Sequence, residues 1–488
     1  MEQRISVLSY AVRGRVILKY GGQLALMLAL LTLAPLGFSL LESEWARALR
    51  YAVICVGLLL GGGYLARLSA PDRLQANEAL SIVAAAFLLS PLLMSWPMMA
   101  GDIGFVDALF EAVSGVTTTG LSTLGSVEHR PAGFLFARAW MQWYGGLGIV
   151  VLSVALLMGH HIAARRLADP AGSGEMLVGT VRIHARHSLI AYLGLTLLGL
   201  VVVWPLTGNG FDALLHVLAA VSTGGFSRFD ASLAGLGSMA AVAIMAISFL
   251  GAVSLPLYWR VIQAGWGGGW RTLAGDVELR ALLGGALLVS ALLSGLAWQH
   301  GVEAPWYHGL MMGFSAQTTT GFGTLPVAEM DPVSKLVMIM SMLVGGSIGS
   351  SAGGFKLLRL LILLRMLQLM IRRSSMPTHA VAEPYLAGQK LETDDLLRAL
   401  QLILLFIGIM FLSWLPFVAL GYDPLDALFE VASATGTVGL STGIARPELE
   451  TVLKGVLCFD MLAGRLEIVA LLVVLYPRNW LGRREEST

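Results

Sequence analysis

The sequence predicts an all-helical integral membrane protein with ten transmembrane helices. Of its 488 residues, 56% are hydrophobic and only 13% are charged, and the mean hydropathy is +0.75. Such a chain has more apolar surface than a soluble core could bury. Apolar runs of about 20 residues, the length that spans a bilayer, recur along it. The net charge of +1 comes without a basic patch, so nucleic-acid binding is not indicated.

Two predicted spans, about 18 to 41 and 49 to 69, precede eight that fall into four pairs. The pairs are 78 to 100 with 134 to 158, 187 to 207 with 237 to 259, 278 to 299 with 333 to 371, and 396 to 420 with 450 to 476. The first span is too long for the core of a signal peptide, so we expect it to be retained. Lys and Arg concentrate on the segments that are cytoplasmic if the N-terminus is inside, which predicts that both termini are cytoplasmic.

Between the two members of each pair, a short amphipathic segment leads into a stretch rich in Thr, Ser and Gly. The four segments are DALFEAVSGVTTTGLST from Asp107, DALLHVLAAVSTGGFSR from Asp212, HGLMMGFSAQTTTGFGT from His308 and DALFEVASATGTVGLST from Asp426. They align without a gap, and in each one a glycine follows a threonine by two positions. Four such matches at one offset indicate an internal repeat.

Two spans separate successive motifs, so all four motifs enter the membrane from the outer face. This arrangement predicts four parallel helix–pore-loop–helix repeats around a pseudo-fourfold pore, unlike the inverted repeats of many secondary transporters. The predicted parts are 1–70 for the two N-terminal helices and 71–165, 166–265, 266–380 and 381–488 for the four repeats.

The Thr/Gly stretches have the composition expected of an ion pathway. About ten helical residues reach only halfway across the bilayer, so the loops are expected to be re-entrant. Non-helical backbone at that depth is tolerated where it lines a water-filled path, and rings of its carbonyl oxygens can replace the hydration shell of a potassium ion. The candidate filter residues are Thr117, Thr118, Thr119, Gly120, Ser222, Thr223, Gly224, Gly225, Thr318, Thr319, Thr320, Gly321, Gly436, Thr437, Val438 and Gly439.

The segment Thr437-Val438-Gly439 resembles the start of the potassium-channel filter signature. The fourfold plan, from about residue 70 onward, resembles the Trk/Ktr/HKT superfamily of potassium transporters, and the two extra N-terminal spans are similar to its bacterial, TrkH-like pore subunits. The resemblance implies potassium uptake across the bacterial inner membrane, with potassium as the bound metal and no organic cofactor. Glycine at all four filter positions implies potassium selectivity, since serine in the first loop accompanies sodium transport in some plant members.

Two residues depart from the repeated pattern inside the predicted pore helices. His308 replaces the opening Asp of the third motif, and His216 stands where Glu111 and Glu430 occupy the first and fourth. Because they lie outside the carbonyl stretch, we expect them to alter local packing or surface potential more than selectivity.

The predicted span 333 to 371 is interrupted by the glycine-rich segment 344–356, whose composition breaks a helix. It resembles the intramembrane loop of the family, which implies a gate below the filter. Arg465 lies at a similar depth in the last predicted span, and a buried arginine needs a partner. The candidates are Glu467, carbonyls of the glycine-rich loop, or an aqueous cavity. The candidate gate residues are Gly345, Gly346, Ser347, Gly349, Gly353, Gly354, Lys356 and Arg465.

The family resemblance also implies a homodimer and a ring of cytosolic, TrkA-like nucleotide-binding regulatory subunits, in addition to membrane lipid. The cytoplasmic connections, about 159 to 186, 260 to 280 and 372 to 395, carry no glycine-rich dinucleotide fingerprint. Regulation by nucleotide is therefore expected to come from another chain.

Two other classes of function remain as alternatives. A coupled secondary transporter of a cation or small solute would show acidic residues or broken helices at the midplane of inverted halves, and neither pattern is visible in the sequence. A membrane enzyme would need a catalytic constellation, and no set of nucleophile, base and metal ligands is visible in the sequence. The two cysteines, Cys55 and Cys458, both lie in apolar runs and are too few for a thiolate metal site.

Overall fold

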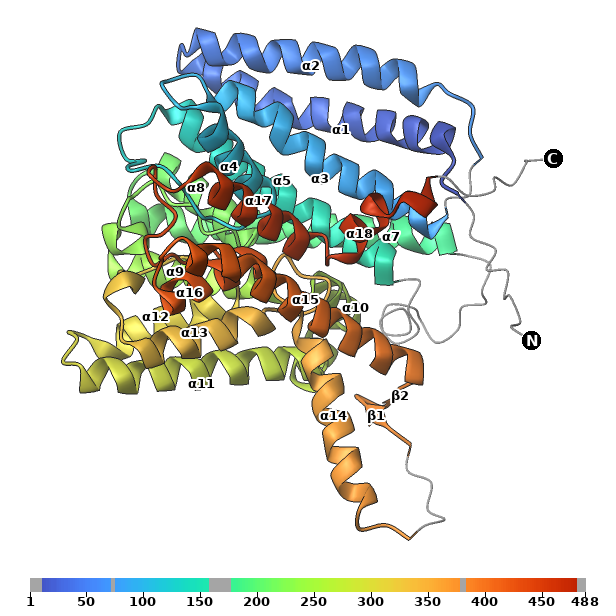
Figure 1. Cartoon of the computed structure of the whole chain (residues 1–488), viewed down its shortest axis with the longest axis vertical. Helices are drawn as coiled ribbons and strands as arrows, with labels where there is room; N and C mark the ends of the chain where they lie inside the picture. Colours follow the sequence, from blue (N-terminus) through green and yellow to red (C-terminus); the bar gives the residue numbers. More distant parts are fainter. Residues whose placement is uncertain (1–10, 72–74, 158–176, 378–382, 481–488) are drawn as a thin grey trace. The chain divides into compact units, whose positions relative to one another are not determined.

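The computed structural model describes residues 11–71, 75–157, 177–377 and 383–480, and this part of the chain is mostly α-helical (Figure 1). Its contacts divide the chain into two compact units. One comprises Met1–Leu109 with Leu466–Thr488, and the other comprises Phe110–Arg465. The predicted connection 159 to 186 lies largely outside the described residues.

The first unit is a group of long helices. They are α1 (Gly14–Leu41), α2 (Trp45–Ala66), α3 (Ala76–Met98), the short α18 (Val469–Leu475) and the 3-10 turn η3 (Pro477–Asn479). Helices α1, α2 and α3 lie side by side, and α18 packs on α3 (Figure 1). The start of α1 is tied to the start of α3 because Arg13 Nε donates to Glu78 Oε1 at 2.8 Å. This buried carboxylate also takes part in capping α3.

The second unit holds all four Thr/Gly stretches. Its elements are α4 (Phe105–Val116, which starts just before the unit), α5 (Ala132–Leu157), α7 (Leu177–Thr207), α8 (Gly210–Val221), η1 (Ser232–Gly235), α9 (Ser238–Ala252), α10 (Leu255–Gly275), α11 (Val277–Gln299), α12 (Pro305–Gln317), η2 (Val327–Glu329), α13 (Pro332–Val344), α14 (Leu357–Arg373), β1 (Tyr385–Leu386), β2 (Gln389–Lys390), α15 (Thr393–Ala419), α16 (Pro424–Thr435) and α17 (Thr451–Arg465).

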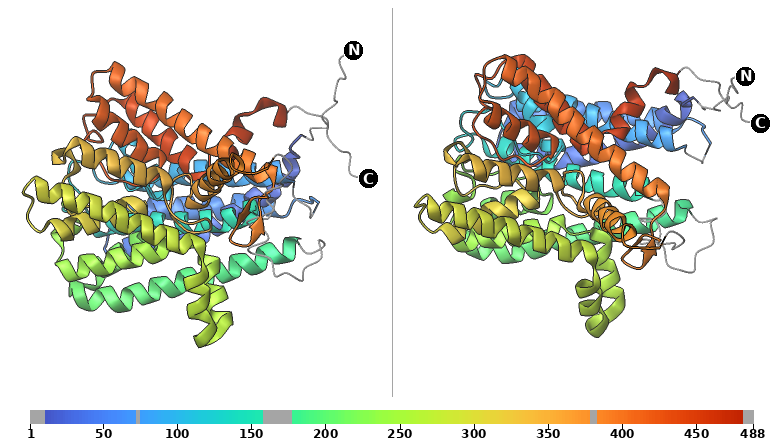
Figure 2. Two further views of the ribbon diagram at one scale, coloured as in Figure 1. Left: turned by 90° about the horizontal axis from the view of Figure 1, so that it is seen from below. Right: turned by 60° about the horizontal axis from the view of Figure 1, so that its bottom comes forward.

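Short helices in this unit fold back against long ones. Helix α8 packs on α7, α12 on α11, and α16 on α15, as the further views in Figure 2 illustrate. With only 12 or 13 residues, each short helix is about 18 Å long and is too short to cross a bilayer. Together with α4, they are the predicted pore helices.

Six helices of the described residues are long and apolar enough to span a membrane, or seven if one bent pair counts as a span. The six are α1, α2, α3 and the first predicted members of the second, third and fourth pairs, α7, α11 and α15. The chain is therefore a multi-pass membrane protein. The sequence predicted ten spans, with an interruption in the span 333 to 371. In the structure the second members of the second and third pairs are broken and that of the fourth pair is short.

The predicted span 237 to 259 bends by 88° between α9 and α10. Pro256 lies in the first turn of α10, where a proline starts a helix but cannot donate a hydrogen bond to the turn before it. The predicted span 333 to 371 stops at Val344, where the backbone of Gly345 turns to φ 71°, and resumes at Leu357. Helix α17 ends at Arg465, before the predicted end of its span.

Candidate functional site

The four predicted pore helices end in the same hydrogen-bonded turn. In each, the amide of a threonine donates to the carbonyl three residues earlier, at 3.0 to 3.3 Å, and the next amide donates to the carbonyl five residues earlier, at 2.7 to 3.0 Å. This pair of bonds is the Schellman motif, which needs a left-handed residue just past the helix. The residues at that position are Thr118, Thr223, Thr319 and Thr437, with φ of 56°, 51°, 53° and 49°.

A left-handed backbone is unfavourable for these threonines. The motif usually places glycine there, because a β-branched side chain clashes in this conformation. Each such residue costs about 1–3 kcal/mol, and strain of this kind clusters at functional sites. The sequence aligned the four threonines but gave no sign that their backbones are strained. Repetition of the strain in all four motifs makes these turns the candidate functional site.

The four filter glycines form a closed ring. A β-carbon added to any one of them would collide with a carbonyl oxygen of another repeat: Gly120 with Gly224, Gly225 with Thr320, Gly321 with Val438, and Gly439 with Thr119. Each of these carbonyls belongs to the residue just before the next repeat's filter glycine, and the fourth repeat returns to the first. The structure thus brings together the four segments that the sequence aligned, around one axis.

Threonine hydroxyls lie beside this ring, fully buried. Thr117 and Thr119 share a hydrogen bond between their Oγ1 atoms at 2.8 Å, and Thr318 and Thr320 share one at 2.7 Å. The hydroxyls of Thr118 and Thr437 are buried with no hydrogen-bond partner among the described residues.

Gln142 is a site residue that the sequence reasoning missed. This side chain, fully buried on α5, donates from Nε2 to the carbonyl of Gly224 at 2.5 Å and accepts at Oε1 from the amide of Phe226 at 3.1 Å. It therefore holds the backbone on both sides of Gly225. A signal for it existed, since Arg138 and Gln142 lie four residues apart, on one helix face, in an otherwise apolar run.

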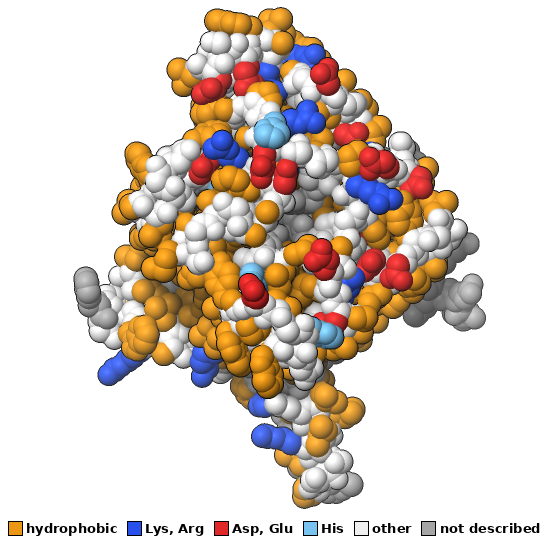
Figure 3. Space-filling model, turned by 90° about the vertical axis from the view of Figure 1, so that its left-hand side faces the viewer, with side chains coloured by type: hydrophobic (Ala, Val, Ile, Leu, Met, Phe, Trp, Pro, Cys, Tyr) orange, Lys and Arg blue, Asp and Glu red, His pale blue; other side chains and the backbone are white. Residues whose placement is uncertain are grey.

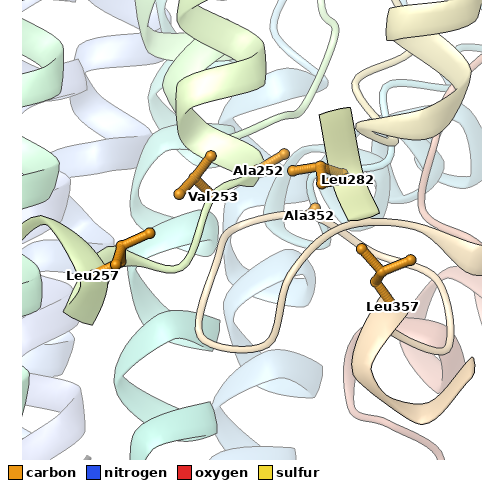
Figure 4. Packing of buried hydrophobic residues seen from close by; sticks show 6 residues of the cluster. All are labelled: Ala252, Val253, Leu257, Leu282, Ala352 and Leu357. Atoms are coloured by element: carbon orange, nitrogen blue, oxygen red, sulfur yellow. The ribbon is translucent and has the colours of Figure 1, made fainter. Parts of the chain in front are cut away.

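The glycine-rich segment 345–356 is a loop folded against the break between α9 and α10. The amide of Ser347 donates to the carbonyl of Ala252 at 3.1 Å, and the amide of Leu255 donates to that of Gly349 at 3.0 Å. Figure 4 shows apolar side chains of the loop region packed with those of α9, α10 and α11. The cluster consists of Ala252, Val253, Leu257, Leu282, Ala352 and Leu357.

Glycines let this loop approach other backbone closely. Gly345, Gly349 and Gly354 have φ of 71°, 75° and 69°. A β-carbon on Gly346 would meet that of Ala352 within the loop. Lys356 closes the segment, with its Nζ donating to the carbonyl of Ala352.

The same loop touches the filter segments of three repeats. The amide of Gly353 donates to Thr319 Oγ1 at 2.6 Å, and the amide of Gly354 donates to the carbonyl of Gly436 at 3.1 Å. Ser351 Oγ lies 3.4 Å from Thr223 Oγ1 and donates to the carbonyl of Val221 at 2.9 Å. The loop therefore packs directly on the strained threonine turns.

Arg465 also reaches this loop. Arg465 is 2% exposed, and its Nη1 donates to the carbonyl of Ser351 at 2.7 Å. Among the partners expected from the sequence, a carbonyl of the glycine-rich loop is thus one that the structure shows. Nε and Nη2 have no hydrogen-bond partner among the described residues.

Acidic side chains gather on the face of the molecule shown in Figure 3. Some of them have structural roles in the loops that follow the Thr/Gly stretches. Asp230 accepts from Ser126 Oγ at 2.6 Å and from the amide of Val127 at 2.7 Å, and Asp331 caps α13 by accepting from the amides of Val333 and Ser334. In the described part of the chain, no group of three or more His, Cys, Asp or Glu residues could hold a metal ion.

Comparisons with known proteins agree with this architecture. The chain is 29% identical over 488 residues to the Trk system potassium uptake protein TrkG of Escherichia coli, covering 96% of this chain and 98% of the relative. It is also 29% identical over 417 residues to an uncharacterized cation transporter of Methanocaldococcus jannaschii, covering 85% of each chain. The crystal structure of the potassium transporter TrkH from Vibrio parahaemolyticus matches 96% of this chain and 100% of its own, with a TM-score of 0.84 and 26% identity.

A family model described as cation transport protein matches residues 51–291 and 304–480, which include all four Thr/Gly stretches, the glycine-rich loop and Arg465. This family is a family of cation transporters and not of enzymes. The match extends over most of the chain, and the chain therefore belongs to the TrkH family of cation transport proteins.

Proposed function

We propose that the chain takes up potassium across the cytoplasmic membrane through a selectivity filter formed by the four Thr/Gly stretches. The observation that carries this proposal is the closed ring in which each filter glycine lies against a carbonyl of the next repeat. Relatives named as potassium uptake proteins, and a solved relative named as a potassium transporter, support the choice of ion.

The chemistry of the ring suits a potassium ion that has lost its water. Along each strand, residues with a left-handed backbone alternate with residues of negative φ. In the first repeat, for example, Thr118 and Gly120 have positive φ and Thr119 between them does not. Alternation of this kind allows successive main-chain carbonyls to point toward one side of the strand, as they do in potassium-channel filters. Four such strands offer rings of oxygens in place of hydration water. The unpaired hydroxyls of Thr118 and Thr437 add two further oxygens that lack protein partners among the described residues.

In the same proposal, the loop 345–356 is the gate, and Arg465 favours its closed position by holding the Ser351 carbonyl. A cytosolic nucleotide-binding subunit and a second copy of the chain complete the assembly that the family resemblance implies. These parts rest on the contacts of the loop with Thr319 and Gly436 and on the resemblance.

Coupled cation symport is the second candidate, and Asp460 on α17 is the observation that favours it. Its carboxylate is fully buried, with Oδ1 accepting from Ser413 Oγ at 2.5 Å. Oδ2 has no hydrogen-bond partner among the described residues. A buried acid in a membrane helix is a candidate proton carrier.

Growth of a potassium-uptake-deficient cell at limiting potassium tests the proposed function. We expect the wild-type chain to restore growth and Gly321→Ala to abolish it, because a β-carbon there collides with the Val438 carbonyl at φ 85°. The control is Gly284→Ala on α11, where no atom lies within 4 Å of the added carbon, and it should grow like wild type. Failure of the wild-type chain to support growth, with expression verified by immunoblot, would refute the proposal.

A further inference from the structure

A buried side chain of the pore helix holds the outer end of the filter strand in three of the four repeats. Glu111, His216 and Glu430 occupy the same position, nine residues before the filter glycine, and all three are 0% exposed. Each bonds to the hydroxyl of the serine two residues after that glycine. The pairs are Glu111 with Ser122, His216 Nε2 with Ser227 at 3.0 Å, and Glu430 with Ser441 at 2.8 Å.

The third repeat makes the equivalent contact with different residues. Its residue nine positions before the glycine is Met312, whose sulfur accepts from the amide of Thr324 at 3.5 Å. His308, which replaces the opening Asp of the motif, places Nδ1 3.0 Å from Thr324 Oγ1. All four strands are thus tied to their own pore helices just outside the ring. Both histidines that depart from the repeated pattern take part in these ties.

The tie in the fourth repeat is the most extensive. Glu430 accepts from Ser441 Oγ, from the amide and hydroxyl of Thr442 at 3.0 and 3.2 Å, and from the amide of Ala445 at 3.1 Å. Several donors that converge on one buried acceptor hold a backbone in one conformation. One side chain therefore sets the path of the strand from residue 441 to residue 445.

His216 serves the same purpose with a neutral ring. Its Nδ1 lies 2.7 Å from the carbonyl of Asp212, which can only accept, so Nδ1 carries the proton. In the neutral ring, Nε2 is then an acceptor and takes the hydroxyl proton of Ser227. This tautomer is set by its neighbours and suits the position without adding a charge.

The first and second repeats are also joined to each other through Arg138. Its Nε donates to Glu111 Oε2 at 2.7 Å, which compensates the buried carboxylate. The guanidinium lies over the ring of Phe226, 3.8 Å from its centroid, and Nη1 donates to the Ser227 carbonyl at 3.4 Å. Phe226 directly follows a filter glycine, so the tie of the first repeat continues into the strand of the second.

We propose that Glu111, His216, His308 and Glu430 are positioning residues that hold the outer filter strands apart at the spacing potassium needs, and so set its discrimination against sodium. A smaller ion is ligated only if carbonyls move inward, and strands anchored from behind resist that movement. The inference rests on the proposed function. It revises the expectation that the two histidines affect packing or surface potential more than selectivity.

The test compares variants on both sides of the contact, using purified full-length protein in liposomes. Ser441→Ala removes one hydroxyl, and His216→Phe keeps a ring that can still stack on Phe229 but removes the acceptor. Reversal potentials under potassium and sodium gradients give the permeability ratio. We expect the potassium preference to fall about tenfold in each variant, as the loss of about 1.4 kcal/mol of discrimination requires, with potassium flux retained. The permeability ratio should fall less in Glu430→Gln, which keeps an acceptor, than in Glu430→Ala.

The control for Glu430→Gln is Glu448→Gln, which makes the same substitution at an outer residue whose side chain is 74% exposed. An unchanged permeability ratio in both Ser441→Ala and His216→Phe would overturn the inference. A fall in Glu448→Gln as large as that in Glu430→Gln would also overturn it, because it would assign the effect to surface potential. A wild-type chain that passes no potassium would instead refute the proposed function. If Glu430→Ala does not assemble, Ser441→Ala, which loses a single oxygen, decides the question.

Discussion

Replacement of Arg465 should open the pore by releasing the loop from one strong contact. Nη1 is the guanidinium nitrogen that donates to the Ser351 carbonyl, at 2.7 Å in a fully buried setting. A hydrogen bond to a charged group contributes about 1.5–3 kcal/mol. Since about 1.4 kcal/mol corresponds to a tenfold change, its loss should shift the loop toward the open position by about ten- to a hundredfold.

Arg465→Met is the variant of choice because it fills a similar volume with apolar atoms. Nε and Nη2 of Arg465 have no hydrogen-bond partner among the described residues, so removing this charge relieves a burial cost. We expect the melting temperature to stay level or rise. The functional readout is single-channel recording in a planar bilayer, where open probability should increase while the conductance of the open state is unchanged.

A second variant separates loop release from a simple change of charge in the pore. Ser351→Ala alters no charge but removes hydroxyl bonds to the carbonyls of Val221 and Gly251, at 2.9 and 3.0 Å. It should also raise open probability. Arg280→Met, on the exposed surface of α11, controls for loss of a positive charge elsewhere. If Arg465→Met leaves open probability unchanged, or if open probability rises only in the variants that lose a charge, Arg465 does not hold the loop closed.

Two further outcomes follow from buried and capping carboxylates. If the chain is a proton symporter, an inward proton gradient should accelerate rubidium uptake by wild type, and Asp460→Asn should abolish this acceleration. If the gradient does not change the uptake rate of wild type, Asp460 does not have this role. At the N-terminus of α13, burial raises the pKa of Asp331, but hydrogen bonds from Ser334 and Val333 outweigh it and hold the pKa below its ordinary value of 3.8. A lowered pKa stabilises the fold above that value, and the gain is lost as pH falls through the folded pKa. The melting temperature of wild type should therefore approach that of Asp331→Asn between about pH 5 and pH 2, and a constant difference would contradict the assignment.

The repeated motif predicted which four glycines lie together, whereas two of the helix breaks around them were not predicted. Gly120, Gly225, Gly321 and Gly439 could be matched because a repeated motif exposes its own register. Their cyclic contacts with neighbouring carbonyls are tertiary, and no local pattern encodes them. The strain at the four threonines could not be predicted either, because the sequence of a Thr-rich run does not indicate which residue adopts a positive φ.

A break in a helix was predicted only where the segment is rich in glycine. Five glycines between Gly345 and Gly354 made the interruption of α13 and α14 predictable. The bend between α9 and α10 depends on a single proline, Pro256, in an apolar run. The end of α17 at Arg465 has no glycine or proline after it, because Glu467 and Ile468 adopt positive φ of 51° and 63° in its place. A positive φ is unfavourable for both residues, so tertiary packing and not local sequence preference ends α17 here.

Because one polypeptide supplies all four quadrants of the ring, each quadrant has its own side chains behind it. Gln142 braces only one strand, and a carboxylate, an imidazole or a thioether can stand at matching positions of different repeats. In an assembly of four identical subunits, one change of sequence would alter every quadrant together. Here a mutation at one of these matching positions changes the side chain behind a single quadrant of the ring and leaves the side chains behind the other three unchanged.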